Sequence, residues 1–175
     1  MSCPLAPAFV RAAEVADAPA LAALQRTIYG EGRWFVGDGP PTTETLRGRL
    51  RALEPTRSLY LVAATQGAGA EAQLSGWLEL HRLNPKKLNH VAVLTLAVGK
   101  PFRRQGIAGE LLGHAYVWAR EVGVHKIQLS VRAKNVAAIS LYEREGFELE
   151  GRERDQVLDE AGFEDNLVMA KFFSK

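Results

Sequence analysis

The chain has 175 residues, of which 47% are apolar and 24% charged. This ordinary globular composition excludes a disordered, collagen-like or coiled-coil protein. The length predicts one domain over residues 1–175, with a loose segment at residues 1–8. The formal net charge of +2 is too small to hold the chain on nucleic acid or a membrane by bulk electrostatics, so we expect neither as a partner.

Few residues could carry thiol or metal chemistry. Cys3 is the only cysteine, which excludes a disulfide framework. The four histidines lack ligand spacing of the HExxH kind, so we expect no metal. The apolar runs at 59–64 and 91–98 are too short to cross a membrane. The start, MSCPLAPAFVR, lacks the basic residues and long apolar core of a signal peptide, which predicts a cytoplasmic protein.

The first third of the chain favours two helices joined by a loop. Asp17 is a plausible N-cap, and apolar residues then recur at helical spacing as far as Gly30. Residues 30–41 are rich in loop formers and should expose the aromatic side chains of Trp34 and Phe35. A second, shorter helix should begin near Thr42 or Thr43.

Three strands are predicted next. They cover residues 59–64, 74–80 and 91–98, with a weakly structured turn at 66–73. The third strand is almost continuously apolar, a pattern typical of a strand covered on both faces.

The second half alternates strands with helices. A helix over 107–122 should end at Gly123, and a strand over 126–132 should follow. Strand, helix and strand in about forty residues form a βαβ unit with parallel strands. Asn135 should cap another helix that Gly146 stops. Two final strands, about 147–155 and 164–172, are joined by a turn that contains Asp159 and Gly162. The order βααβββαβαββ predicts a mixed α/β (α+β) fold whose central sheet is antiparallel except at the βαβ unit, flanked by about four helices.

A basic, glycine-containing loop opens the helix that starts near residue 107. Unpaired backbone N–H groups and the helix dipole favour an anion there. Gly106 and Ala108 have so little side chain that a phosphate can reach the backbone, and Arg103 and Arg104 add positive charge. An ordinary helix start with solvated arginines is the alternative.

Two other nucleotide-binding motifs fail here. A P-loop needs GxxxxGK[ST], but Gly99-Lys100 is followed by Pro101 with no second glycine at the required distance. A dinucleotide fingerprint needs GxGxxG and a carboxylate at the end of the next strand, which instead ends in Ser130-Val131-Arg132.

The arrangement Arg103-x-x-Gly106-x-Ala108 resembles the acetyl-CoA pyrophosphate motif of the GCN5-related N-acetyltransferase (GNAT) superfamily. The resemblance covers about residues 10–173 and rests on three blocks in order: HVAVLTLAVGKPFRRQGIAGELL, KIQLSVRAKNVAAISLYEREGFELEG and DNLVMAK. It is nearest to bacterial acetyltransferases that act on amino acids and small amines.

This resemblance implies that strands 91–98 and 126–132 splay apart around the pantetheine of acetyl-CoA. Asn135 would contact the pantetheine arm or acetyl end, and Tyr142 would lie at the thioester sulfur. The full set of residues implied to bind acetyl-CoA is Leu96, Ala97, Val98, Arg103, Arg104, Gln105, Gly106, Ile107, Ala108, Asn135 and Tyr142.

Two candidate catalytic residues follow. Tyr142 lies seven residues after Asn135, so both project from one helix face. In the implied mechanism Tyr142 would protonate the departing thiolate. The alternative is that Tyr142 is only a core aromatic and that Asn135 is only a helix cap. Glu79 lies on one strand face with Trp77 and His81 and is a candidate base, or an ordinary surface carboxylate. His90 is a second candidate base.

The function implied is direct acetyl transfer from acetyl-CoA to a primary amine of a small molecule such as an amino acid, with the oxyanion held near the Val98 N–H. Two alternatives stay open: acetylation of a protein N-terminus or polyamine, and an idle acyl-CoA-binding regulatory domain. Acceptor specificity should lie in segments 30–41, 83–89 and 155–164. The sequence leaves the oligomeric state open, a homodimer included.

Overall fold

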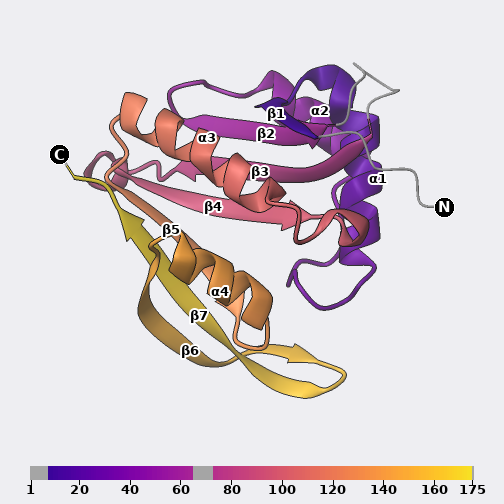
Figure 1. The fold of residues 1–175 in the computed structure, drawn as a ribbon, viewed down its shortest axis with the longest axis vertical. Coiled ribbons are helices and arrows are strands. Elements are labelled where there is room, and N and C mark those ends of the chain that lie inside the picture. The colour runs from indigo at the N-terminus through magenta and orange to yellow at the C-terminus, as the bar shows by residue number, and fades with distance from the viewer. Residues whose placement is uncertain (1–7, 65–72, 175) are drawn as a thin grey trace.

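The computed structural model describes residues 8–64 and 73–174, and a seven-stranded sheet in the order β1-β2-β3-β4-β5-β7-β6 organises them (Figure 1). The strands are β1 (Phe9–Ala12), β2 (Ser58–Ala64), β3 (Leu74–Arg82), β4 (Val91–Val98), β5 (Lys126–Arg132), β6 (Glu148–Asp159) and β7 (Gly162–Phe172). The helices are α1 (Ala18–Tyr29), α2 (Thr43–Arg51), α3 (Ile107–Glu121) and α4 (Val136–Arg144). Most of the predicted loose segment at 1–8 and of the predicted turn at 66–73 lies outside the described residues.

The mixed α/β prediction is confirmed. Every neighbouring pair of described strands is antiparallel except β4 and β5, which flank α3 in the predicted βαβ unit. No described helix is long and apolar enough to cross a membrane.

Because strand side chains alternate between faces, the sheet supports two separate cores. One core joins Leu78 and Leu80 of β3 to Leu111 of α3 and Tyr142 of α4. The other joins Trp77 of β3 to residues of α1 and α2. Figure 1 shows α3 and α4 on the same side of the sheet. Helices therefore cover both faces, as a sheet with two apolar faces requires.

Asn135 and Asp17 lie at the predicted starts of their helices, but only Asn135 caps its helix with its side chain. Asn135 caps α4, and its side chain accepts a hydrogen bond from the Ala138 N–H at 3.2 Å. Asp17 is at the N-cap position of α1, but its carboxylate instead binds the Arg11 guanidinium at 2.6 and 2.7 Å and accepts from the Glu14 N–H. Burial, the largest single cause, would raise the pKa of Asp17, but the Arg11 hydrogen bonds, the Glu14 N–H and the charge of Arg11 together lower that pKa. The pair thus fastens β1 to α1.

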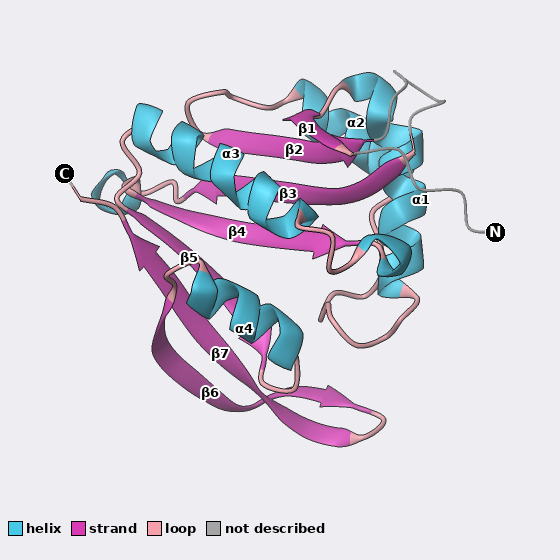
Figure 2. Ribbon diagram, viewed as in Figure 1, coloured by secondary structure: helices cyan, strands magenta, loops and turns pink. Residues whose placement is uncertain are grey.

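Strands β4 and β5 pair only at their beginnings. The register runs from Val91 opposite Lys126 to Val93 opposite Gln128 and then stops, so the strands diverge as the resemblance implied (Figure 2). The expectation that β4 is covered on both faces is wrong for its second half, because residues 95–97 are only half-buried. They have lost the neighbouring strand that would have covered them.

The C-terminal hairpin is longer than the sequence indicated. Pairing of β6 with β7 continues to Asp159 opposite Gly162, so the turn is Glu160-Ala161 and not the segment 155–164. The residues that we expected in a loop include Leu158 and Phe163, which pair across the hairpin. Such a two-residue connection keeps the strands together to the tip, and the hairpin projects from the body of the molecule (Figure 2).

Candidate active site

The loop before α3 presents its backbone outward. Arg104 and Gly106 both have a left-handed conformation, with φ of 63° and 81°. Among the described residues, the N–H groups of residues 104–106 find no hydrogen-bond acceptor. A Cβ added at Gly106 would meet no atom within 4 Å. Adjacent free N–H groups at a helix start form an anion-binding concavity, so this loop fits a pyrophosphate.

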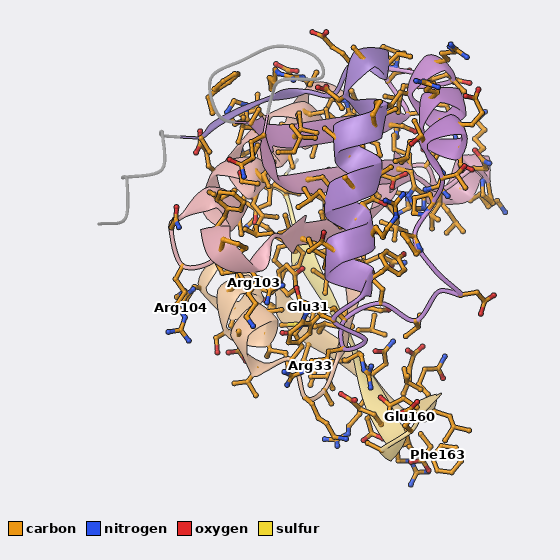
Figure 3. The ribbon with its side chains drawn as sticks, turned by 90° about the vertical axis from the view of Figure 1, so that its right-hand side faces the viewer. Glu31, Arg33, Arg103, Arg104, Glu160 and Phe163 are labelled. Carbon is orange, nitrogen blue, oxygen red and sulfur yellow. The ribbon has the colours of Figure 1, made fainter. Side chains whose placement is uncertain are left out.

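The two arginines of the loop have different environments. Arg104 is exposed and forms no ion pair with any described residue. The Arg103 guanidinium is bound on two sides: Nε donates to the Val98 carbonyl at 3.0 Å, and both Nη atoms donate to the Glu31 carboxylate at 3.0 and 2.6 Å. Figure 3 shows Arg103 beside Glu31, while Arg104 points away from the body. Only Arg104 therefore offers an uncompensated side-chain charge to an anion.

Asn135 and Tyr142 lie on α4, across the opening from the end of β4. Asn135 is half-buried at the start of the helix, and Tyr142 is 7% exposed in the core beside Phe147, with ring centroids 5.4 Å apart. Burial raises the pKa of the Tyr142 hydroxyl, so it stays protonated across the neutral range. The ring packs in the core, but the hydroxyl has no hydrogen-bond partner among the described residues, so no contact within the described fold occupies it.

The two candidate bases are far apart. Glu79 is on β3, opposite Tyr60 of β2 on one side and Thr95 of β4 on the other. Thr95 belongs to the half-exposed stretch of β4. The pKa of the Tyr60 hydroxyl is raised, by burial first and then by the nearby Glu79 charge. His90 precedes β4 and is about 26 Å from Val98 at roughly 3.3 Å per residue. Geometry therefore leaves Glu79 near the opening and His90 at the wrong end of the strand.

A cavity of about 540 Å³ lies between three segments that are distant in sequence: the α1–α2 loop at residues 32–34, the end of β5 and start of α4 at 132–135, and the hairpin at 159–164. Glu79 and Tyr142 are not among the residues that line it. Asn135 both lines this cavity and caps α4.

Charged side chains hold one wall of the cavity. Arg132 is 6% exposed and donates hydrogen bonds to Glu164, which is 5% exposed, and to Asp159. Glu164 also accepts from the Lys134 N–H at 2.9 Å. The pKa of Asp159 is lowered, first by its hydrogen bond with Arg132 and then by the Ala161 N–H. These contacts join β5, the connection that follows it and the hairpin into one wall.

Two of the three segments expected to set specificity meet at this cavity. The segments 30–41 and 155–164 both contribute to it. The segment 83–89 does not, because it connects the end of β3 to the start of β4 at the opposite edge of the molecule (Figure 1). Trp34 and Phe35 are half-buried and not exposed: Phe35 stacks between Tyr29 and Trp77, with centroids 4.6 and 5.9 Å away.

Sequence reasoning missed Glu31 and the Arg132–Glu164 pair. The partners are 72 and 32 residues apart, and no spacing rule connects such positions. Among the described residues, no group of three or more His, Cys, Asp or Glu side chains could hold a metal ion.

Comparison with known proteins decides the family. The model named "Acetyltransferase (GNAT) family" matches residues 24–147. The chain belongs to the GNAT family. This confirms the resemblance read from the Arg103-x-x-Gly106-x-Ala108 motif and its flanking blocks.

Solved GNAT structures share the whole fold. An acetyltransferase of the GNAT family from Streptococcus pneumoniae superposes with a TM-score of 0.84 at 28% identity, covering 95% of this chain and 99% of that one. The Salmonella typhimurium protein yncA, whose structure contains its cofactor acetyl-CoA, gives 0.85 at 16% identity over 96% and 95%, which shows the fold alone.

A curated relative covers less of this GNAT chain. The "[Ribosomal protein bS18]-alanine N-acetyltransferase" of Escherichia coli K12 is 36% identical over 83 residues, which are 47% of this chain and 56% of that protein. The chain thus matches little more than half the length of that relative.

Proposed function

We propose that the chain is an N-acetyltransferase that moves an acetyl group from acetyl-CoA directly to a primary amine. The observation that carries the proposal is the loop of residues 104–106, whose free N–H groups face open space beside Gly106, at the mouth of the opening between β4 and β5. When bound, acetyl-CoA supplies the acetyl group as a thioester. Membership of the GNAT family supports the same reaction.

The chain's own residues divide the work in this proposal. The N–H groups of residues 104–108 and the charge of Arg104 bind the pyrophosphate. Leu96, Ala97 and Val98 offer backbone hydrogen bonds to the pantetheine, and Asn135 lies at its acetyl end. Val98 lies nearest the loop and its N–H would hold the oxyanion. Tyr142 donates a proton to the leaving sulfur, and Glu79, directly or through water, takes one from the amine.

For the acceptor we propose a small molecule such as an amino acid. The 540 Å³ cavity is lined by two cations, Arg33 and Lys134, and by the Glu160 carboxylate. Arg33 forms no ion pair with a described residue, and the Lys134 ammonium is 3.9 Å from Glu164. Such a lining suits a molecule that carries both an ammonium and a carboxylate group.

A polypeptide N-terminus is the second candidate, and a specific feature favours it. A further hollow of about 210 Å³ adjoins the hairpin and is lined in part by Val36 and Leu158, whose surfaces are 66% and 68% exposed. A free amino acid would leave these two exposed apolar side chains uncovered, whereas the residues after an acetylated N-terminus could cover them. The relative named for bS18 alanine acetylation points the same way.

The test of cofactor binding compares two glycines that flank α3. Gly106 and Gly123 both have positive φ and open space at the Cβ position, so a Val at either costs similar strain. Calorimetry should show acetyl-CoA binding at least about tenfold weaker for Gly106→Val, the loss of one charge-assisted hydrogen bond. Gly123→Val should bind as the wild type does, and equal affinity in both variants would overturn the proposal. If the Val variants are unstable, the matched Ala pair repeats the comparison.

The acceptor class is tested with three amines at saturating acetyl-CoA: L-alanine, an alanine-initiated hexapeptide with an amidated C-terminus, and spermidine. Preference for L-alanine supports the small-molecule acceptor. Preference for the hexapeptide replaces it with a polypeptide N-terminus. Binding of acetyl-CoA without turnover of any primary amine would make the chain an idle acyl-CoA-binding domain.

A further inference from the structure

The Arg103 guanidinium joins three parts of the molecule at one point. Its own backbone belongs to the loop before α3, its Nε binds the last carbonyl of β4 at Val98, and its Nη atoms bind Glu31 of the α1–α2 loop. The same guanidinium lies over the indole of Trp34, 5.6 Å from the ring centroid. The Trp34 Nε1–H in turn donates to Glu31 at 2.7 Å.

This arrangement withdraws Arg103 from anion binding. The bidentate contact matches a planar guanidinium to a carboxylate, and such pairs are stronger and more directional than a lysine contact. Burial by itself would raise the pKa of Glu31, but the hydrogen bonds from Arg103 and Trp34 lower it. Glu31 is therefore ionised at neutral pH and compensates the charge of Arg103. Of the two arginines, only Arg104 would then offer its charge to an anion at the loop.

The segment that Arg103 holds is a wall of the larger cavity. Gly32, Arg33 and Trp34 line that cavity directly after Glu31. Gly32 has a positive φ and no neighbour at its Cβ position, so no side-chain packing holds the backbone at that point. Phe35 anchors the far side of this segment by stacking on Tyr29. On the near side, the contacts of Arg103 and Trp34 with Glu31 perform that role (Figure 3).

We propose that Arg103, the first residue of the loop motif, is a positioning residue for the acceptor site: it fixes residues 31–34 against the end of β4 and so shapes the cavity that receives the amine. This inference rests on the proposed function. It separates the roles of two adjacent arginines, because Arg104 serves the pyrophosphate and Arg103 serves the acceptor. It also connects the cofactor loop and the acceptor wall through a single side chain.

The experiment uses the full chain with Arg103→Gln, Glu31→Gln, the double variant and Arg104→Gln. Acetyl-CoA affinity is measured by calorimetry, and KM is measured for whichever of L-alanine and the alanine-initiated hexapeptide the wild type acetylates. Acrylamide quenching of tryptophan fluorescence reports on Trp34, because Trp77 and Trp118 are only 2% and 9% exposed.

We expect Arg103→Gln and Glu31→Gln each to raise the amine KM by about tenfold, as expected for one charge-assisted hydrogen bond, and to make Trp34 easier to quench. Their acetyl-CoA affinity should stay within about twofold of the wild type. The double variant should be no worse than either single variant, because both remove one interaction. Arg104→Gln should show the opposite pattern, with weaker acetyl-CoA binding and unchanged quenching.

A pyrophosphate role for Arg103 gives different results. Arg103→Gln would then weaken acetyl-CoA binding as Arg104→Gln does, and Glu31→Gln would leave that binding equal or tighter because it frees the guanidinium. Either result, or unchanged Trp34 quenching in Arg103→Gln, overturns the positioning role. The Gly106 and Gly123 comparison tests acetyl-CoA binding independently, so failure of this inference and failure of the proposed function are distinguishable.

Discussion

The proposed cofactor loop and the proposed acceptor cavity are constructed in opposite ways. The loop at residues 103–108 is continuous in sequence and presents mainly backbone N–H groups, with small residues at Gly106 and Ala108. The cavity takes its walls from three separate segments and presents charged side chains held by ion pairs, such as Arg132 with Glu164. A binding site made of local backbone is readable as a motif, whereas one made of distant side chains is not.

Because of this difference, we expect substitutions at the loop and at the cavity to have different effects. Side chains that face the cofactor have few partners within the fold, so changing them should alter binding or rate and leave stability almost intact. Side chains at the cavity are tied to other elements, so changing them should alter stability as well. Three predictions test that contrast.

The largest effect is expected at Tyr142. Its hydroxyl has no partner among the described residues, so Tyr142→Phe removes a proton donor and no structural hydrogen bond. We expect kcat to fall by about 10² or more, within the range of general acid catalysis, with little change in Tm or acetyl-CoA affinity. Tyr116→Phe is the matched control, because the Tyr116 hydroxyl donates to Glu145 at 3.2 Å.

Tyr116→Phe should lower the stability by about 1 kcal/mol, the value of one intramolecular hydrogen bond, and leave kcat unchanged. If Tyr142→Phe keeps full activity and instead lowers Tm, the expected contrast between cofactor-facing and cavity side chains is contradicted. That outcome would make Tyr142 purely structural.

An intermediate effect is expected at Arg132. Arg132→Gln leaves the buried Glu164 carboxylate with only the exposed Lys134 ammonium, 3.9 Å away, as a cation. The loss of the buried partner should lower the free energy of unfolding by about 3 kcal/mol and raise the amine KM. Arg152→Gln is the control on the same hairpin: the Arg152 side chain is 62% exposed in its pair with Asp165, so it should cost at most about 1 kcal/mol. Urea unfolding of the two variants measures the difference, and equal losses would contradict it.

The same variant has a pH signature. Because the pKa of Asp159 is lowered in the folded protein, first by Arg132, its pairing stabilises the fold above its ordinary pKa of about 3.9. That contribution is lost as the pH falls through the lowered value. Thermal unfolding between pH 7 and pH 2 should therefore show a smaller acid-range loss of stability in Arg132→Gln than in the wild type.

The smallest effect is expected at Glu79, since water can take the proton in its place. Glu79→Gln should lower kcat/KM by about 10- to 100-fold, at or below the usual range for general base catalysis, and most at low pH, where the amine is protonated. Glu148→Gln is the control, because Glu148 is an exposed carboxylate of β6. Parallel pH–rate profiles for wild type and Glu79→Gln would show Glu79 to be a surface carboxylate.

Local interactions allowed much of the fold to be predicted. The strands Val91–Val98 and Lys126–Arg132 begin and end where their apolar patterns indicated, because alternation and turn residues act over a few positions. Asn135 caps α4 and Gly123 follows the end of α3 for the same reason. The loop before α3 could be read as an anion site because the free N–H groups of a helix start are a consequence of local geometry.

By itself, then, the sequence determined the order of the elements, the Asn135 cap of α4, the family and the loop of free N–H groups before α3, because each depends on neighbouring residues. Only the tertiary structure decided that Arg103 binds Glu31, that β4 loses its partner after Val93, and that the hairpin continues to Asp159 and meets residues 32–34 at a cavity. These features depend on pairs separated by tens of residues, which come together only when the sheet twists and its two cores pack. The proposed acceptor site is therefore a property of the fold, while the proposed cofactor loop is already present in six consecutive residues.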